Sequence, residues 1–153
     1  MFLTVHAVAG ELIAQSAVTP GQALVMGFLS HFLLDALPHG DEDIGDHVHP
    51  KRNTLLLFKI AFLDLSIAGI VQASLFATST LGWGILPIAA AFGAMLPDAM
   101  QLPSIILKSD SGLFGWYRRA HESVHNLIGV RLGWKVGLVF QGFTLLLLID
   151  ALG

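Results

Sequence analysis

Long apolar segments constrain the fold of this chain more than any other feature. Residues 54–78 hold only Lys59 and Asp64 as charged side chains, and residues 133–152 form the cleanest apolar run. Each run matches the roughly 20 residues that a helix needs to cross the hydrocarbon core of a bilayer. The composition agrees, since 54% of the 153 residues are hydrophobic and only 12% are charged, against about 25% charged in ordinary soluble domains. The sequence therefore predicts an integral membrane protein.

Three further apolar segments complete the predicted bundle. Residues 1–18 lack the basic start of a secretory signal and are predicted to form a retained helix, short enough to be tilted or partly re-entrant. A turn with Pro and Gly precedes the segment at 22–37, and a proline ends the segment at 83–96. Aromatic and basic side chains within 114–127 predict an amphipathic helix at the membrane surface. We expect an all-α fold, with residues 1–153 forming one transmembrane helical domain of about five hydrophobic segments plus this interfacial helix.

Charge and cysteine content exclude several functional classes. The formal net charge is −3 and no basic run with interleaved aromatic residues is present, so nucleic-acid binding is not expected. The chain has no cysteine, which excludes disulfides, thiolate nucleophiles and cysteine-ligated metal sites. Any bound metal must therefore be held by histidine and carboxylate side chains.

The basic residues predict the orientation of the chain. If the five segments alternate in direction, the loop at 39–53 and the region 97–130 lie on one side of the membrane. The basic residues that flank this side are Lys51, Arg52, Lys108, Arg118, Arg119 and Arg131. The opposite turns at 19–21 and 79–82 have none. Because lysine and arginine are enriched in cytoplasmic loops, this side is expected to face the cytoplasm and the C-terminus to face outward.

Histidine and aspartate residues from four parts of the chain are expected at the depth of this side. His31 and Asp35 lie four residues apart in SHFLLD and share one helix face. The others are His6 in the first segment, Asp98 at the end of the fourth, and His121 and His125 in the surface helix. Buried ionisable groups are costly unless they are paired or bind a metal. Histidine and carboxylate donors suit zinc, manganese or iron, so these residues predict a site for one or two divalent transition-metal ions, with zinc favoured.

The same residues also have structural interpretations. His31 and Asp35 can serve helix capping or packing. His121 and His125 can lie on a solvated helix face, and Asp98 can be a turn residue after proline.

Other polar residues are weaker candidates for metal binding. His47 and His49 lie in a polar loop, where solvation is favoured over ligation. Glu11 and Asp64 lie deeper and can support a ligating histidine. Asp64 can alternatively pair with Lys59, although a spacing of five residues does not suit a contact on one helix face.

Several short motifs resemble a known family. His6 in the opening helix, the SHFLLD run, the LPD motif at 96–98 and the later HESVH stretch are together similar to small bacterial inner-membrane proteins described as membrane-bound metal-dependent hydrolases. These proteins are similar in turn to zinc-dependent phospholipases C, in which helical HxxxD or HxxxE pairs hold zinc. The matching positions here are His6, His31, Asp35 and Asp98. Met100 departs from the pattern, since the family has a second acidic residue there, and HESVH departs from its HRGxTHS-like stretch.

The resemblance implies metal-assisted hydrolysis of a lipid or lipid-linked phosphoester at the cytoplasmic face of a bacterial inner membrane. The bound ions would lower the pKa of a water and polarise a phosphoryl or acyl oxygen. Glu122 or Asp41 would act as general base, and Arg118 or Arg119 would hold an anionic head group.

Two other functional classes stay open. A non-enzymatic metal-binding or ion- or proton-transporting protein needs polar groups across the bilayer, and only Glu11, Lys59 and Asp64 continue toward the far side. A bis-histidine haem or structural-metal membrane protein needs two histidines at similar depth on facing helices, which His6 and His31 can provide. Haem does not need the carboxylates that accompany them.

Overall fold

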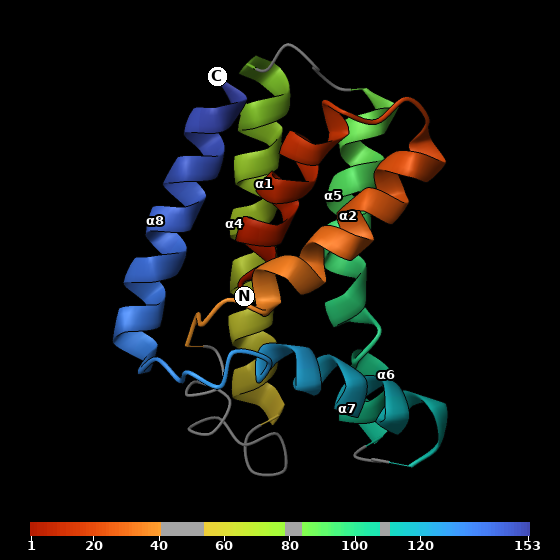
Figure 1. Ribbon diagram of the computed structural model, residues 1–153, viewed down its shortest axis with the longest axis vertical. Coiled ribbons are helices and arrows are strands. Elements are labelled where there is room, and N and C mark those ends of the chain that lie inside the picture. Colours follow the sequence, from red (N-terminus) through yellow and green to blue (C-terminus); the bar gives the residue numbers. More distant parts are fainter. Residues whose placement is uncertain (41–53, 79–83, 108–110) are drawn as a thin grey trace.

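Helices account for the regular secondary structure in the described part of the chain. The computed structural model describes residues 1–40, 54–78, 84–107 and 111–153. The helices in these ranges are α1 Leu3–Ala14, α2 Pro20–Asp35, α4 Thr54–Thr78, α5 Ile85–Ala99, α6 Leu102–Leu107, α7 Gly112–His125 and α8 Trp134–Leu152 (Figure 1). The predicted all-α fold is confirmed. The predictions made for Asp41, His47, His49, Lys51, Arg52 and Lys108 concern residues outside the described ranges.

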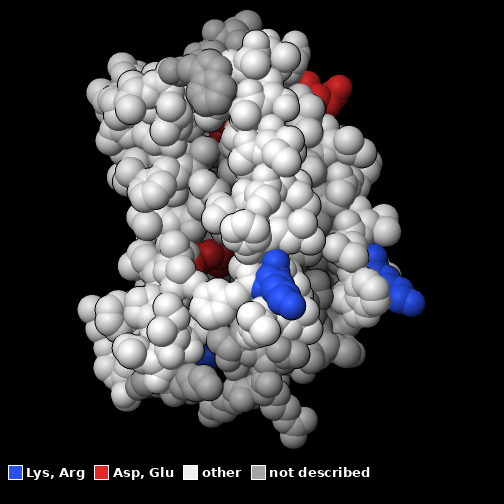
Figure 2. All heavy atoms as spheres, turned by 180° about the vertical axis from the view of Figure 1, so that it is seen from behind, with Lys and Arg blue, Asp and Glu red and all other residues white. Residues whose placement is uncertain are grey.

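Three helical stretches within the described residues have the length and composition of membrane spans: Leu55–Thr78, Ile85–Leu107 and Trp134–Leu152. Figure 2 shows a face of the molecule on which charged side chains are few, as a lipid-facing surface requires. In contrast, α1 has 12 residues and α2 has 16, so they are about 18 and 24 Å long against a hydrocarbon core of about 30 Å. The structure is consistent with a membrane protein, and the predicted count of five spanning segments is not confirmed.

Helices α1 and α2 form a hairpin that packs against α5, and α1 is the more buried of the two. In Figure 1, α1 begins near the middle of the molecule, and the turn that leads into α2 lies at the end opposite α7. The turn has clear sequence signals, because Thr19 Oγ1 accepts a hydrogen bond from the backbone N–H of Gln22 (3.2 Å) and Pro20 occupies the first turn of α2. The first segment therefore ends at Ala14, well before a full span.

Small residues bring the hairpin close to α5. A Cβ added to Gly10 of α1 would lie 2.7 Å from the carbonyl oxygen of Ala90. A Cβ at Gly27 of α2 or at Gly93 of α5 would meet the backbone of the facing helix even more closely. Glycine and alanine at these crossings let the helix backbones approach, which is a common basis of helix association in membranes.

Helix boundaries differ from the sequence prediction at Pro97, at the end of α1 and at α6. The fourth segment was predicted to stop at residue 96, but α5 continues through buried Pro97 to Ala99. An internal proline removes one backbone hydrogen bond, and helices packed within a membrane bundle tolerate this loss. The first segment ends four residues before its predicted limit, and α6 was not predicted. The other helices begin and end within about two residues of the predicted limits, a difference typical of frayed helix ends.

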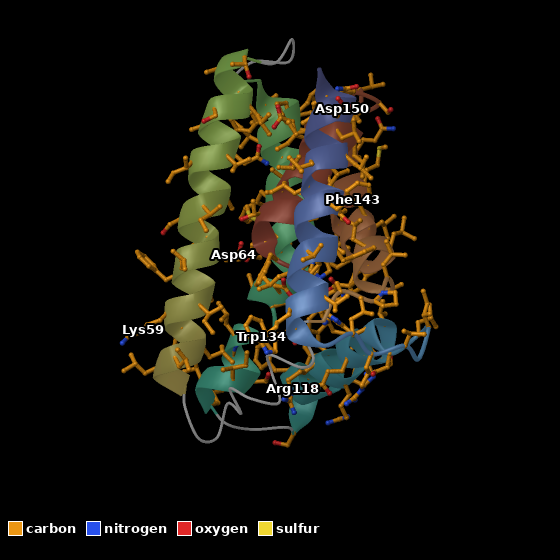
Figure 3. The ribbon with its side chains drawn as sticks, turned by 90° about the vertical axis from the view of Figure 1, so that its left-hand side faces the viewer. Lys59, Asp64, Arg118, Trp134, Phe143 and Asp150 are labelled. Atoms are coloured by element: carbon orange, nitrogen blue, oxygen red, sulfur yellow. The ribbon has the colours of Figure 1, made fainter. Side chains whose placement is uncertain are left out.

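Asp64 joins α4 to the start of α1. Its carboxylate accepts hydrogen bonds from the backbone N–H of Leu3 (2.6 Å), from the backbone N–H of Thr4 (3.2 Å) and from the Thr4 hydroxyl (2.7 Å). The N-cap residue of α1 is Phe2, whose side chain makes no capping hydrogen bond. Figure 3 shows Asp64 on the inner side of α4 and Lys59 pointing away from the bundle. Asp64 thus caps α1 from a neighbouring helix and does not pair with Lys59.

Candidate metal centre

The structure brings together all six residues that were predicted to bind metal. They lie where α1, α2, α5 and α7 meet: His6 on α1, His31 and Asp35 on α2, Asp98 on α5, and His121 and His125 on α7. The α1–α2 hairpin places His6, His31 and Asp35 in the interior, because both helices pack against α5 through small residues. Side chains from distant parts of the sequence therefore share one buried cluster.

Asp35 is the centre of this cluster and is fully buried. Its Oδ2 lies 2.8 Å from Nε2 of His31 and 2.9 Å from Nε2 of His125. The Nε2 of His121 follows at 3.5 Å, and the Nε2 of His6 lies 3.1 Å from the other oxygen, Oδ1. Two ligands of a tetrahedral zinc ion, each about 2.0 Å from the metal, are about 3.3 Å apart. The observed separations between Asp35 oxygens and histidine nitrogens, from 2.8 to 3.5 Å, therefore include the distance expected between two ligands of one zinc ion.

Two groups of donor atoms share the Asp35 carboxylate. His31, Asp98 and His121 form one group with it, and all four donor atoms lie within 4.8 Å of one another. The Nε2 atoms of His31 and His121 are 3.7 and 3.6 Å from Asp98 Oδ1. This arrangement offers four ligands to one ion, which is the coordination number usual for zinc.

His39 belongs to the second group and was not among the predicted ligands. Asp35, His39 and His125 offer donor atoms within 4.8 Å of one another. The spacing of four residues from His31 to Asp35 to His39 was an available signal. Because Pro38 ends the helical pattern, that spacing no longer implied a shared face, yet the chain after α2 keeps His39 buried beside Asp35.

Backbone carbonyl groups orient two of the histidine rings. His31 Nδ1 lies 2.8 Å from the carbonyl oxygen of Ala94, and His39 Nδ1 lies 2.6 Å from the carbonyl oxygen of Leu37. When Nδ1 donates to a carbonyl, the Nε2 lone pair is free to face a metal, as metal-ligating histidines commonly show. In both residues Nε2 is the atom that faces Asp35.

The buried Nδ1 of His6 has no hydrogen-bond partner among the described residues. Buried polar groups of proteins are nearly always satisfied, and an unpaired one calls for an explanation such as an ion. The donor set, consisting of imidazole nitrogens and carboxylate oxygens, fits a divalent transition metal.

The α7 residues of the site lie outside the three spanning stretches. Burial, together with the neighbouring His125, lowers the pKa of His121 to about 3. His121 is therefore neutral at physiological pH, which is the form that binds metal. Burial, with the nearby Asp98 charge, raises the pKa of Tyr117 to about 12, and its hydroxyl donates a hydrogen bond to the carbonyl oxygen of Pro97 (3.0 Å).

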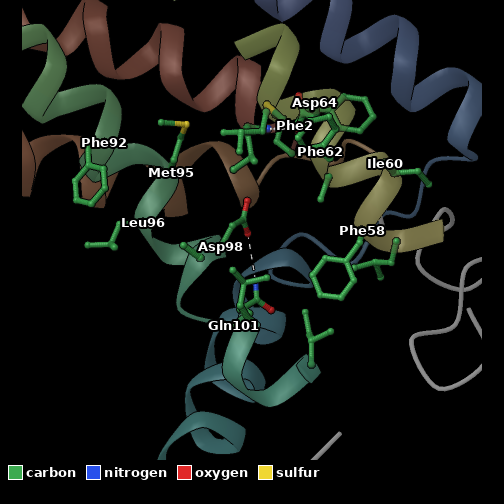
Figure 4. A pocket seen from close by; sticks show the side chains of 18 residues that line it. Phe2, Phe58, Ile60, Phe62, Asp64, Phe92, Met95, Leu96, Asp98 and Gln101 are labelled. Atoms are coloured by element: carbon green, nitrogen blue, oxygen red, sulfur yellow. Dashed lines mark hydrogen bonds between the residues drawn. The ribbon is translucent and has the colours of Figure 1, made fainter. Parts of the chain in front are cut away.

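Two glutamines support the cluster and were missed at the sequence level. Gln101 Nε2 donates to Asp98 Oδ1 (3.2 Å) and lies 3.3 Å from Nδ1 of His121 (Figure 4). Gln141 of α8 donates from Nε2 to the carbonyl oxygen of His39 (2.9 Å), and its Oε1 accepts from the backbone N–H of Phe2 (2.7 Å). Neither glutamine has a sequence signal, because each acts through a contact between distant segments.

The α-amino nitrogen of Met1 also reaches the cluster. It lies 2.6 Å from Oδ1 of Asp35 and 2.7 Å from Nε2 of His39. The start of α1 is thus held at the cluster by these contacts, in addition to the Asp64 cap.

The residues predicted to act in catalysis lie at the rim or outside the described chain. Glu122 is exposed, and its Oε1 lies 3.4 Å from Nη1 of Arg118, one turn earlier on α7. Arg119 is exposed on the same helix. Asp41 lies outside the described residues. The structure therefore places the two arginines and Glu122 on the helix that carries His121 and His125, with Glu122 paired to Arg118.

The bis-histidine haem alternative conflicts with the geometry of the two rings. The His6 and His31 rings are stacked, with centroids 4.0 Å apart and an interplanar angle of 22°. Axial histidines bind haem iron from opposite faces of the macrocycle. Rings in direct contact leave no room for a porphyrin between them.

The fold and the cluster define this chain as an all-helical protein with helices able to span a membrane and a buried histidine–aspartate site suited to a metal ion. In comparisons with known proteins, no family model, curated protein or solved structure matches the chain.

Proposed function

We propose that this protein is a membrane-embedded, metal-dependent hydrolase that acts on a lipid or lipid-linked phosphoester at the cytoplasmic face of a bacterial inner membrane. The observation that carries the proposal is the convergence of histidines from three separate segments on the buried Asp35 carboxylate, with Nε2 atoms 2.8–3.1 Å from its oxygens. Such a concentration of ionisable groups inside a membrane protein marks a functional site.

Zinc is the favoured ion, with manganese or iron as alternatives. His31, Asp98 and His121 would hold one ion with Asp35, and His39 and His125 would hold a second one with the same carboxylate. A divalent ion in such a site supplies Lewis acidity toward a phosphoryl oxygen and lowers the pKa of a water.

Asp98 is the part of the site that substrate would reach first. Its side chain is 30% exposed, whereas His31 and Asp35 have no exposed side-chain surface. Gln101 holds the Asp98 carboxylate in place through its amide. A phosphoester arriving beside Asp98 would therefore meet the accessible edge of the donor set.

The residues of α7 would bind the phosphate group and assist proton transfer. Arg118 and Arg119 provide cationic groups on the same helix as His121 and His125, and guanidinium groups match the geometry of phosphate oxygens. Glu122, or Asp41 in the loop after α2, would accept a proton from the attacking water. The ion pair between Arg118 and Glu122 would open when an anionic substrate competes for the guanidinium.

A non-enzymatic metal or proton carrier is the alternative. The fully buried Glu11 on α1 is the observation in its favour, because it extends the polar residues beyond His6. Asp64, the next step of such a path, is instead engaged by the N-terminus of α1. The alternative predicts metal-dependent flux without hydrolysis, which vesicle assays can separate from phosphoester cleavage.

Elemental analysis of the detergent-purified protein after a mild chelator wash tests the proposal. We expect one or two transition-metal ions per chain in the wild type and loss of metal in the His31→Ala/Asp35→Ala double variant. Asp150→Asn is the matched control, because this acidic residue is exposed near the end of α8. Metal retained in the double variant would refute the site. So would a wild type that stays metal-free after loading with zinc, manganese and iron. Cleavage of lipid phosphoesters by the metal-loaded wild type alone would then establish the hydrolase.

A further inference from the structure

A cavity of about 730 Å³ lies between α4 and the α5–α6 segment, with the first residues of the chain forming part of its wall. Figure 4 shows Phe58 and Phe62 of α4 across from Phe92, Met95 and Leu96 of α5. Its lining is almost entirely carbon. A volume of this size is within the range of small-molecule binding sites.

The cavity adjoins the candidate metal centre at Asp98, which belongs both to the cavity lining and to the donor group. In Figure 4 the Asp98 carboxylate points into the space between the two helices, with Gln101 beneath it. The same carboxylate has an oxygen 3.7 Å from Nε2 of His31 and 3.6 Å from Nε2 of His121. The other carboxylate of the lining, Asp64, is engaged in capping α1. Asp98 is therefore the polar end of an otherwise apolar cavity.

The position of the cavity indicates the chemistry of its occupant. It lies between two stretches long and apolar enough to cross a membrane, Leu55–Thr78 and Ile85–Leu107. Phe62 and Leu65 on one side and Phe92 on the other are exposed in this protein chain, so in a bilayer they face hydrocarbon. An apolar ligand that enters from the bilayer needs no passage through water, whereas a polar one would lose hydration without gaining partners.

We propose that this cavity binds a hydrocarbon chain of the lipid substrate and positions the attached phosphoester at Asp98. The reaction in this assignment rests on the proposed hydrolase function. The binding of the hydrocarbon chain rests on the cavity alone. It specifies the substrate as a phosphoester attached to a long hydrocarbon chain, taken directly from the membrane. Water-soluble phosphoesters would lack the group that the cavity holds.

Photo-crosslinking tests chain binding without requiring hydrolysis. The full-length protein is reconstituted into phosphatidylethanolamine and phosphatidylglycerol vesicles with a trace of phosphatidylglycerol that carries a diazirine on one acyl chain. We expect crosslinks concentrated on cavity residues such as Phe58 and Met95, and a several-fold lower yield at these positions in Ala61→Trp, which fills the cavity from α4. Ala73→Trp is the control, since Ala73 is exposed on the same helix and is not among the lining residues.

The remaining outcomes are decisive as well. Crosslinks spread evenly over cavity and outward-facing residues such as Ile70 would overturn the assignment, as would crosslinked dimers that join two copies through the cavity. Ala61→Leu provides a smaller obstruction if the tryptophan variant fails to fold by circular dichroism. If the metal-loaded enzyme is active, Ala61→Trp should raise KM for the long-chain lipid several-fold more than KM for bis-p-nitrophenyl phosphate. Cavity crosslinks in a protein that binds no metal would refute the proposed function and leave the chain-binding site standing.

Discussion

At the scale of single residues, the properties of the site follow from how each buried donor atom is satisfied. His31 and His39 each direct Nδ1 at a backbone carbonyl group, which leaves Nε2 for the cluster. Asp35 Oδ2 lies among the Nε2 atoms of several histidines, at 2.8 Å from His31 and 2.9 Å from His125. A bound cation would satisfy all these groups together, so single substitutions in the cluster are informative.

Asp35→Asn should weaken metal binding more than any other single change in the cluster. The amide keeps the shape of the side chain but supplies only one neutral oxygen, and both donor groups lose their shared carboxylate. Changes that only affect residues supporting a ligand cost about 10–100-fold in affinity, so the loss here should exceed about 100-fold. Competition with a chelating dye measures it, with Asp150→Asn as control. An affinity within a few-fold of the wild type would contradict the central role of Asp35.

His39→Ala distinguishes one bound ion from two. If the second donor group holds its own ion, the variant should lose that ion and keep the one held by His31, Asp98 and His121. Metal content per chain by mass spectrometry should then fall by half, while the wild type retains its full complement. An unchanged ratio would restrict the site to a single ion and make His39 a supporting residue.

At the scale of helices, the cluster depends on where α1 starts and how closely it packs. Asp64 of α4 caps the N-terminus of α1. Helices α1 and α2 both contact α5 through glycine and alanine. Both features position His6 and His31 without contacting a ligand atom. Their effects should therefore appear first in stability and only then in metal affinity.

Asp64→Ala should destabilise the protein by about 1–2 kcal/mol, the usual cost of removing a helix cap. The variant leaves the backbone N–H groups of Leu3 and Thr4 without their acceptor. Unfolding in mixed detergent micelles measures the change, and Lys59→Ala is the control on the same helix because Lys59 points outward (Figure 3). Equal stability of the two variants would show that the cap contributes nothing.

Gly93→Leu should prevent correct packing of α2 on α5. A side chain there meets the backbone of Leu24, which cannot move aside as a flexible side chain does. Overpacking of a well-packed interior costs about 1–3 kcal/mol or more, and the backbone clash places this variant at or above the upper end. Gly142→Leu on α8 is the control, since nothing lies near a Cβ at that position. Thermal unfolding in detergent should separate the two.

At the scale of the whole molecule, the hairpin of α1 and α2 has its turn at one end and the cluster near the other, where α7 crosses (Figure 1). The chain has no cysteine, so single cysteines report which end is accessible. Ser123→Cys lies on exposed α7, and Ser16→Cys lies in the exposed α1–α2 turn.

The proposed orientation predicts opposite labelling of these two positions. In intact spheroplasts, a membrane-impermeant maleimide should label Ser16→Cys and leave Ser123→Cys unlabelled until the membrane is permeabilised, because basic residues such as Arg118 and Arg119 favour the cytoplasmic side. The reverse pattern would place the candidate site on the outer face and would exclude a cytoplasmic substrate.

Apolar runs, helix-breaking residues and the spacing of histidine and aspartate predicted six of the seven helices of the described residues, without α6 and with a longer α1, and the six histidine and aspartate residues that meet in the cluster. These signals are local, since a run of apolar residues or a spacing of four is visible wherever the chain folds. The tertiary structure decided the rest: His39 joins the cluster after the end of α2, Gln101 and Gln141 support it, Asp64 caps α1, and an apolar cavity opens on Asp98. Each of these depends on a contact between segments far apart in sequence, and such contacts follow from how the helices pack and leave no trace in the pattern of any one segment.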